Sequence, residues 1–139
     1  MVWLQKDIQL PAFPKGCHSI SRQITEALPE LAKIRIGLLH VFVKHTSASL
    51  TINENADPSV LVDLDRVLDT LADENFPYYH QDEGPDDMPA HVKSSLFGSS
   101  LTVPIRDGQL LLGTWQGICL CEYRHRGPRR KVVLTVQGE

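Results

Sequence analysis

The chain has no excess of positive charge. Its 14 lysine and arginine residues are outnumbered by 17 aspartate and glutamate residues, so the formal net charge is -3 at pH 7. Proteins that bind nucleic acid or an anionic membrane need a basic face, and neither partner is favoured here. Long hydrophobic runs are missing too. The longest, residues 36–43, is interrupted by His40 and falls far short of the ~18 residues of a membrane span.

Cysteine is scarce, which argues against a disulfide-stabilised secreted domain. The three cysteines, Cys17, Cys119 and Cys121, are odd in number, and the N-terminal segment MVWLQKDIQL has no secretion signal. Two thiolates on one strand face, without a second pair, make a poor zinc site, so we interpret Cys119 and Cys121 as small buried apolar residues. We expect a soluble, cytoplasmic protein with reduced thiols.

Repeats and low-complexity segments are absent, and 139 residues at 42% hydrophobic content suit a single domain spanning residues 1–139. Charge is unevenly distributed within it. Residues 63–87 hold many acids and only Arg66 as a base, whereas residues 124–131 hold bases and no acid. Solvated surface is the simpler explanation, but the two segments brought together could hold a cation beside a phosphate.

Apolar spacing predicts two or three short helices. Residues 21–31 carry apolar side chains on one helical face, and Pro29 ends or kinks this helix. The clearest helix starts after Asp57, which suits the N-cap, with Pro58 at its first position and leucines at spacings of three and four. Residues 75–89 lack any period and form a loop, and a short helix follows over about residues 89–96.

Strands predominate elsewhere. The run IGLLHVFV, residues 36–43, is apolar on both faces and predicts a buried central strand in which His40 is a hydrogen-bonded core residue. Alternation over residues 101–112, then strands at residues 118–123 and 131–136, predicts an antiparallel meander. The fold class is therefore α+β with curved antiparallel sheets, a partly open β-barrel or sandwich.

Polar residues that could carry chemistry gather in three segments. In HTSASLTINENADP, His45 follows an apolar strand and could ligate a metal or move a proton, although a lone histidine where a strand leaves the core through a turn is more often structural. In GTWQG, residues 113–117, Trp115 could stack on an aromatic ligand or pack in a strand core.

The segment HQDEGPDDMPAH combines four carboxylates with His80 and His91. The oxygens suit Mg²⁺ and the imidazoles suit Zn²⁺ or a similar transition metal. Its spacing matches neither an EF-hand nor an H-E-x-x-H helix, so a solvated acidic loop remains the alternative.

Together, HTSASLTINENADP, YYHQDEGPDDMPAHVKSSL, GSSLTVP and GTWQGI resemble the YjbQ-like family, whose members are named as secondary thiamine-phosphate synthases. The resemblance covers essentially the whole chain. It implies an α+β fold with a partly open antiparallel barrel, assembled as a homotrimer with polar clefts between subunits.

The implied activity, a secondary one, joins hydroxymethylpyrimidine diphosphate to thiazole phosphate and needs Mg²⁺ or a transition metal such as Zn²⁺. A small phosphorylated substrate would meet the motif residues. The resemblance implies catalytic roles for His45, Glu54, Asn55, Glu83, Asp87, Trp115 and Gln116, and metal binding by His45, His80 and His91. The sequence offers Lys93, Arg124 and Arg126 as the cations that could bind phosphate.

Two alternatives stay open. Three histidines among carboxylates also suit a metal-dependent hydrolase. A non-catalytic trimer that binds a metabolite or a metal would keep the same histidines and aromatic residues without turnover.

Overall fold

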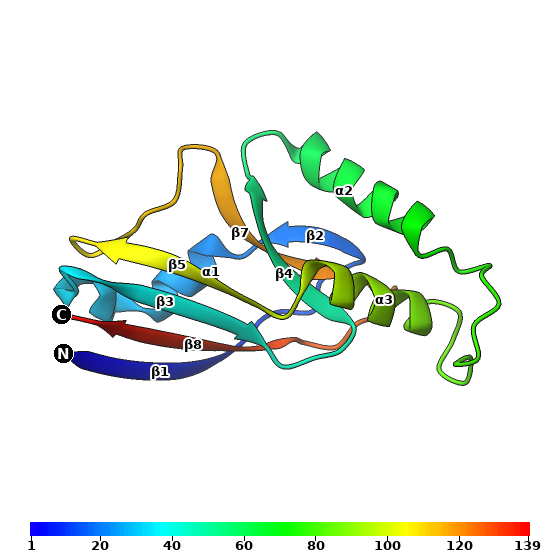
Figure 1. Cartoon of the computed structure of the whole chain (residues 1–139), viewed down its shortest axis with the longest axis horizontal. Helices are drawn as coiled ribbons and strands as arrows, with labels where there is room; N and C mark the ends of the chain where they lie inside the picture. The colour runs from blue at the N-terminus through cyan, green and yellow to red at the C-terminus, as the bar shows by residue number, and fades with distance from the viewer.

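The computed structural model describes all residues, 1–139, as two antiparallel sheets with three α-helices and one 3₁₀-helix (Figure 1). The larger sheet has the order β1-β8-β3-β5-β6 and curls into a half-barrel, and the smaller has the order β2-β7-β4. The α+β class is confirmed. The elements are β1 (Val2–Gln9), β2 (Gly16–Ser19), α1 (Ser21–Ala27), η1 (Pro29–Lys33), β3 (Ile36–Val43), β4 (Ala48–Glu54), α2 (Pro58–Leu71), α3 (Asp87–Phe97), β5 (Ser100–Arg106), β6 (Gln109–Leu110), β7 (Gln116–Glu122) and β8 (Lys131–Gly138).

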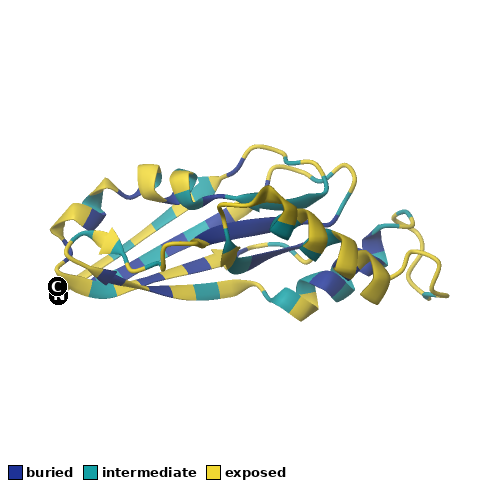
Figure 2. Ribbon diagram, turned by 90° about the horizontal axis from the view of Figure 1, so that it is seen from above, coloured by how far each residue is buried: buried dark blue, intermediate teal, exposed yellow.

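The hydrophobic core lies between the two sheets. Buried and accessible positions alternate along the strands of the larger sheet, as the colour bands of Figure 2 show, because successive side chains of a strand point to opposite faces. Leu39 and Val41 of β3 meet Leu50 of β4 and Leu120 of β7 in one cluster of 18 buried residues, and Ile24 of α1 belongs to the same cluster.

The prediction that β3 is buried on both faces is wrong. Although β3 lies centrally in its sheet, Ile36 and Leu38 are about half exposed and Phe42 is 40% exposed. His40 is exposed as well, so it is not a core residue as predicted. Its Nδ1 lies 3.2 Å from Thr102 Oγ1 on the outer face of the sheet. The smaller sheet and α1 cover only the inner face of the larger sheet, so every second side chain of β3 remains on the surface of the single chain.

The predicted C-terminal meander is wrong as well. After the β5–β6 hairpin the chain crosses to the smaller sheet, where β7 pairs with both β2 and β4. It then returns, and β8 inserts between β1 and β3. In this arrangement β7 and β8 each have a hydrogen-bonded strand on both sides. In every case the partner strand is distant in sequence.

The helices largely follow the predictions, and α3 positions the candidate site. Pro29 ends α1 and begins η1. The N-cap of α2 is confirmed, since the Asp57 carboxylate accepts a hydrogen bond from the Ser59 N–H at 2.9 Å. α3 begins two residues earlier than predicted, because Pro89 fits within the first turn, where its missing N–H needs no partner. α3 packs against β4 and α2 against β2, and none of the helices is long and apolar enough to cross a bilayer.

Candidate metal centre

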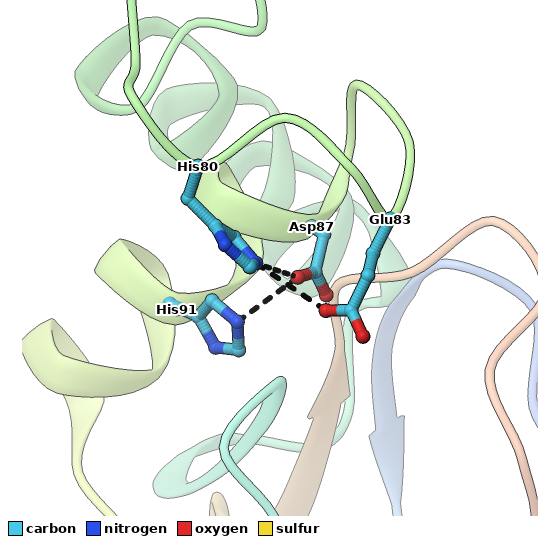
Figure 3. A group of neighbouring side chains, drawn as sticks. All are labelled: His80, Glu83, Asp87 and His91. Atoms are coloured by element: carbon cyan, nitrogen blue, oxygen red, sulfur yellow. Dashed lines mark hydrogen bonds and ion pairs between the residues drawn. The ribbon is translucent and has the colours of Figure 1, made fainter.

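Four potential ligands converge where the irregular loop enters α3. His80 and Glu83 come from the loop, and Asp87 and His91 lie one helical turn apart on α3, so their side chains share one face. Their ligand atoms all lie within 4.8 Å of one another. Figure 3 shows the two imidazoles approaching the Asp87 carboxylate from different sides, with Glu83 beside it.

Asp87 is the centre of this cluster. Its side chain is only 3% exposed, and its Oδ2 lies 2.7 Å from His80 Nε2 and 3.0 Å from His91 Nε2. Its Oδ1 accepts a hydrogen bond from Arg124, which also donates to the Glu83 carbonyl at 2.8 Å. Burial acts to raise the pKa of Asp87, but the hydrogen bond from His80 and the charges of His91 and Arg124 outweigh it and lower the pKa. Asp87 therefore carries its negative charge at neutral pH.

The hydrogen bonds of His91 require a proton or a metal ion between its Nε2 and Asp87. Its Nδ1 lies 2.9 Å from the Thr46 carbonyl oxygen, which can only accept, so Nδ1 carries a proton. In the neutral ring Nε2 is then an acceptor, yet it faces the Asp87 oxygen at 3.0 Å. Two acceptors at this distance repel each other unless a proton or a metal ion lies between them. The Nδ1–H bond to a carbonyl is also the contact that orients metal-binding histidines.

The donor set fits a divalent transition metal. Two imidazole nitrogens with one or two carboxylates suit Zn²⁺ or a similar borderline ion better than Mg²⁺, which prefers oxygen ligands alone. The pKa of His80 is raised, chiefly by its hydrogen bond to Asp87 and against the effect of desolvation. Metal binding at His80 must therefore displace a proton that this hydrogen bond holds.

An open cavity of about 840 Å³ adjoins the cluster. His91 belongs to both, and Thr46, whose carbonyl oxygen lies 2.9 Å from His91 Nδ1, also lines the cavity. Most of the other lining residues are of polar types, and they include an ammonium, a second imidazole and three hydroxyls, from Lys44, His45, Ser94, Ser95 and Ser99. The volume lies within the range typical of small-molecule sites.

His45 lines the cavity but lies outside the four-residue cluster. Its Nε2 accepts the Lys131 backbone N–H at 2.8 Å, so in the neutral ring the proton is on Nδ1. Burial lowers the pKa of His45, and the nearby positive charge of Arg130 lowers it further. His45 is thus a neutral ring whose Nε2 lone pair is already used, and it offers a donor rather than a metal ligand.

A buried ion pair supports the turn that carries His45. Arg130 Nε donates to Glu122 Oε1 at 2.7 Å, and a second nitrogen of Arg130 donates to the Ser47 carbonyl at 3.2 Å. Both side chains are almost fully buried, at 2% and 0% exposed. Sequence reasoning missed Arg130, since nothing distinguishes it from the other bases of residues 124–131.

The remaining motif residues gather elsewhere in the chain. Glu54 and Asn55 follow the far end of β4, where Glu54 pairs with Gln116 and the Asn55 N–H donates to the Trp115 carbonyl at 2.8 Å. β4 begins at Ala48 beside α3, and its length separates this group from the cluster by about 20 Å, at ~3.3 Å per residue. Within one chain the structure therefore does not bring Glu54, Asn55, Trp115 and Gln116 to the metal cluster.

Of the three predicted phosphate ligands, only Arg124 lies at the cluster. Its two terminal nitrogens donate to Asp87 and to the Glu83 carbonyl, and its Nε lies 3.1 Å from Asp86 as an ion pair without a hydrogen bond. Lys93 is buried, and its ammonium donates to Asp69 at 2.6 Å. Arg126 is exposed in the turn between β7 and β8. The basic group of the cavity is Lys44, which sequence reasoning missed although it directly precedes His45.

The arrangement combines a buried anionic ligand, two imidazoles, and an exposed carboxylate that can accept a proton. Glu83 is 64% exposed and its Oε2 lies 3.3 Å from His80 Nε2. A cation bound here would be held from one side by protein groups and would face the cavity on the other. Such a site attracts ligands with anionic oxygens.

Comparison with known proteins places this fold and sequence among uncharacterised relatives. Residues 6–139 match the family model described as UPF0047 protein YjbQ-like. The UPF0047 protein YjbQ of Salmonella typhimurium is 49% identical over 138 residues, 99% of this chain and 100% of that protein. A conserved hypothetical protein of Thermus thermophilus has a TM-score of 0.80 and 35% identity, covering 96% of this chain and 99% of that one. A YbjQ-like protein of unknown function from Sulfolobus solfataricus has a TM-score of 0.87 at 23% identity, covering 99% of each chain.

The prediction that this chain is a thiamine-phosphate synthase is wrong. The relatives carry only the family designation, and the Sulfolobus structure is that of a protein of unknown function, so these comparisons give no evidence for such an activity. The geometry agrees with this correction, because Lys93 is engaged with Asp69, and Trp115 lies at the other end of β4.

Proposed function

We propose that this chain, which belongs to the YjbQ-like UPF0047 family, holds a divalent transition-metal ion with His80, Asp87 and His91 and uses it to bind a small phosphorylated molecule in the adjoining cavity. The observation that carries the proposal is the convergence of two imidazole nitrogens on one buried carboxylate oxygen, with one of the two imidazoles, His91, also lining the cavity.

Neighbouring groups orient the proposed metal ligands. Arg124 holds Asp87 in place through Oδ1 and leaves Oδ2 directed at the imidazoles. The Thr46 carbonyl fixes the His91 ring so that Nε2 faces the cluster. A bound divalent ion supplies positive charge that attracts and polarises a phosphoryl oxygen.

The cavity wall complements a phosphate group. His45 presents a neutral Nδ1–H donor, and Lys44 supplies a positive charge that no acidic partner in the chain neutralises. The Ser94 and Ser95 hydroxyls donate to the Ala48 and His91 carbonyls, and retain lone pairs that can accept from a ligand hydroxyl. A small molecule that carries phosphate and hydroxyl groups is the chemistry these side chains fit.

We expect the purified protein to contain about one equivalent of a transition metal per chain, measured by inductively coupled plasma mass spectrometry without exposure to chelator. After chelation, phenyl phosphate should bind at least ~10-fold more tightly when Co²⁺ is restored, because the metal and the anion share one cavity. Isothermal titration calorimetry measures both affinities.

Benzyl alcohol is the matched control ligand, since it keeps the ring and lacks the anion. Its affinity should not depend on Co²⁺. Absence of metal from the purified protein together with equal phenyl phosphate affinity before and after Co²⁺ addition would contradict the proposal.

We also propose that the chain assembles as a homotrimer through the uncovered face of the larger sheet. Trp3, Leu38 and Phe42 are 67%, 48% and 40% exposed, an apolar face that monomeric proteins rarely leave open. Phe42 also lines the cavity, so a neighbouring copy would stand at its mouth. In a ring of identical copies, one surface of each copy contacts a different surface of the next. Such a ring could bring the motif residues at one end of β4 close to those at the other end of β4 in the adjacent copy.

Light scattering coupled to gel filtration should give three times the 15.6 kDa chain mass. Leu38→Lys should shift the protein to the monomer mass, because a charge in an apolar contact is costly to bury. Val67→Lys on α2, at a side chain that is 54% exposed on another surface, is the control and should leave the trimer intact. A monomeric wild-type protein is the opposing result.

A further inference from the structure

Two of the three cysteines face each other across the smaller sheet. Cys17 of β2 and Cys121 of β7 are directly paired in the antiparallel register, and their Sγ atoms lie 2.8 Å apart. Both are free thiols in this structure. The sulfurs are therefore closer than two unbonded sulfur atoms normally pack, and a small rotation of either side chain reaches the ~2.05 Å of a disulfide.

The strand register places this pair where a cross-strand disulfide is geometrically allowed. The Ile20 N–H donates to the Ile118 carbonyl at 2.8 Å, so Ile20 and Ile118 form a hydrogen-bonded pair. Pairs alternate along an antiparallel ladder, and Cys17–Cys121 lies three steps away, at a non-hydrogen-bonded position. There the Cα atoms are ~4.5 Å apart and the side chains are closest, within the range that a disulfide spans.

The two sulfurs differ in accessibility. Cys121 is fully buried in a small cluster with Leu68 of α2 and Ala90 of α3, whereas Cys17 packs at the edge of that cluster and is partly exposed. The hydrogen bond with Cys17 and burial raise the pKa of Cys121, which keeps it protonated. Cys17 is therefore the sulfur that a small oxidant meets first, and Cys121 is the one positioned to resolve the product.

We propose that Cys17 and Cys121 form a reversible disulfide when the protein meets a peroxide. In the first step the Cys17 sulfur attacks one peroxide oxygen, the O–O bond breaks, and Cys17 becomes a sulfenic acid with release of water from hydrogen peroxide. In the second step the Cys121 sulfur attacks the Cys17 sulfur, and the leaving hydroxyl takes up the Cys121 proton and departs as water. Two thiols are oxidised, one peroxide is reduced, and two waters form.

The bond would join two segments that are distant in sequence. β2 is a four-residue edge strand, and the disulfide would tie it to β7, from whose end Arg124 reaches Asp87. A cross-link between residues 17 and 121 closes a long loop and so restricts the unfolded chain strongly. A reducing thiol would reverse it by exchange.

The experiment treats the full-length reduced protein with a small excess of hydrogen peroxide and follows it by mass spectrometry. The Cys119→Ser variant is used alongside wild type, because trypsin leaves Cys119 and Cys121 on one peptide. In both proteins the mass should fall by two hydrogen atoms, and the peptides that contain residues 17 and 121 should become linked. The melting temperature should rise by roughly 10 °C and return after dithiothreitol.

Cys17→Ser, a change at the partly exposed position, should abolish both the linked peptide and the rise in melting temperature. Appearance of the link between Cys17 and Cys119 in wild type, or over-oxidation of Cys17 to the sulfinic acid without a link, would overturn the proposal. So would a linked peptide in the Cys17→Ser protein. These outcomes are independent of metal binding, which is measured separately.

Discussion

His91→Ala is expected to weaken metal binding by ~100-fold or more. The substitution removes one of two imidazole ligands and also the ring that the Thr46 carbonyl orients. Asp87 would keep its contacts with His80 and Arg124, so the remaining ligands would stay in place. Competition titration with a chromophoric chelator, using Co²⁺ and Zn²⁺ in turn, measures the affinity.

His125→Ala is the matched control for that change. His125 is also an imidazole near a carboxylate, with Nε2 3.2 Å from Glu74, but it lies outside the cluster. Its loss should leave metal affinity within about twofold, since no ligand is removed. A melting curve for each variant separates loss of the ligand from loss of the fold. Equal metal affinity in the His91→Ala protein and wild type would exclude the assigned centre.

Arg130→Met is expected to lower the free energy of unfolding by about 3–5 kcal/mol. The change leaves the Glu122 carboxylate buried without its cationic partner, and Glu122 is 0% exposed. Gly127 packs so closely against that carboxylate that a side chain there would collide with it, so the turn leaves no free space on that side. Since a domain of this kind is stabilised by only about 5–15 kcal/mol, the variant loses a large share of its stability. Urea unfolding followed by circular dichroism measures the difference.

The double variant Glu122→Gln plus Arg130→Met tests the cause. It removes both charges, while the amide oxygen of the introduced glutamine can still accept the Arg124 backbone N–H that Glu122 accepts in wild type at 3.1 Å. It should recover most of the loss if the uncompensated charge is responsible. A double variant as unstable as Arg130→Met would instead assign the loss to packing and to the bond from Arg130 to the Ser47 carbonyl.

Local features of the chain were predictable in part, because capping and turn formation are local. The sequence grouped the four potential ligands within residues 80–91, but it began the helix at about residue 89 and so did not place Asp87 one turn before His91 on α3. The helix boundaries followed from Asp57, Pro29 and Gly98, which act within one turn of their own positions. These inferences needed no knowledge of any other element.

Other parts of the site depended on contacts between distant segments. The role of His45 changes once its Nε2 accepts the Lys131 N–H, a contact between residues 86 positions apart. The family resemblance grouped the motif GTWQG with the histidines in one cleft, yet within one chain β4 separates them by its whole length. Side-chain chemistry alone does not reveal which end of a strand a distant loop reaches.

The amino-acid sequence by itself determined the α+β class, the helices with their caps, and the loop that supplies His80 and Glu83, because periodicity, capping and turn formation depend on neighbouring residues. Only the tertiary structure decided that β7 and β8 belong to different sheets, that Arg130 is buried against Glu122, and that Cys17 meets Cys121. Strand order and burial depend on the competition among all possible pairings in the chain. That competition is resolved by the core as a whole rather than by any one segment.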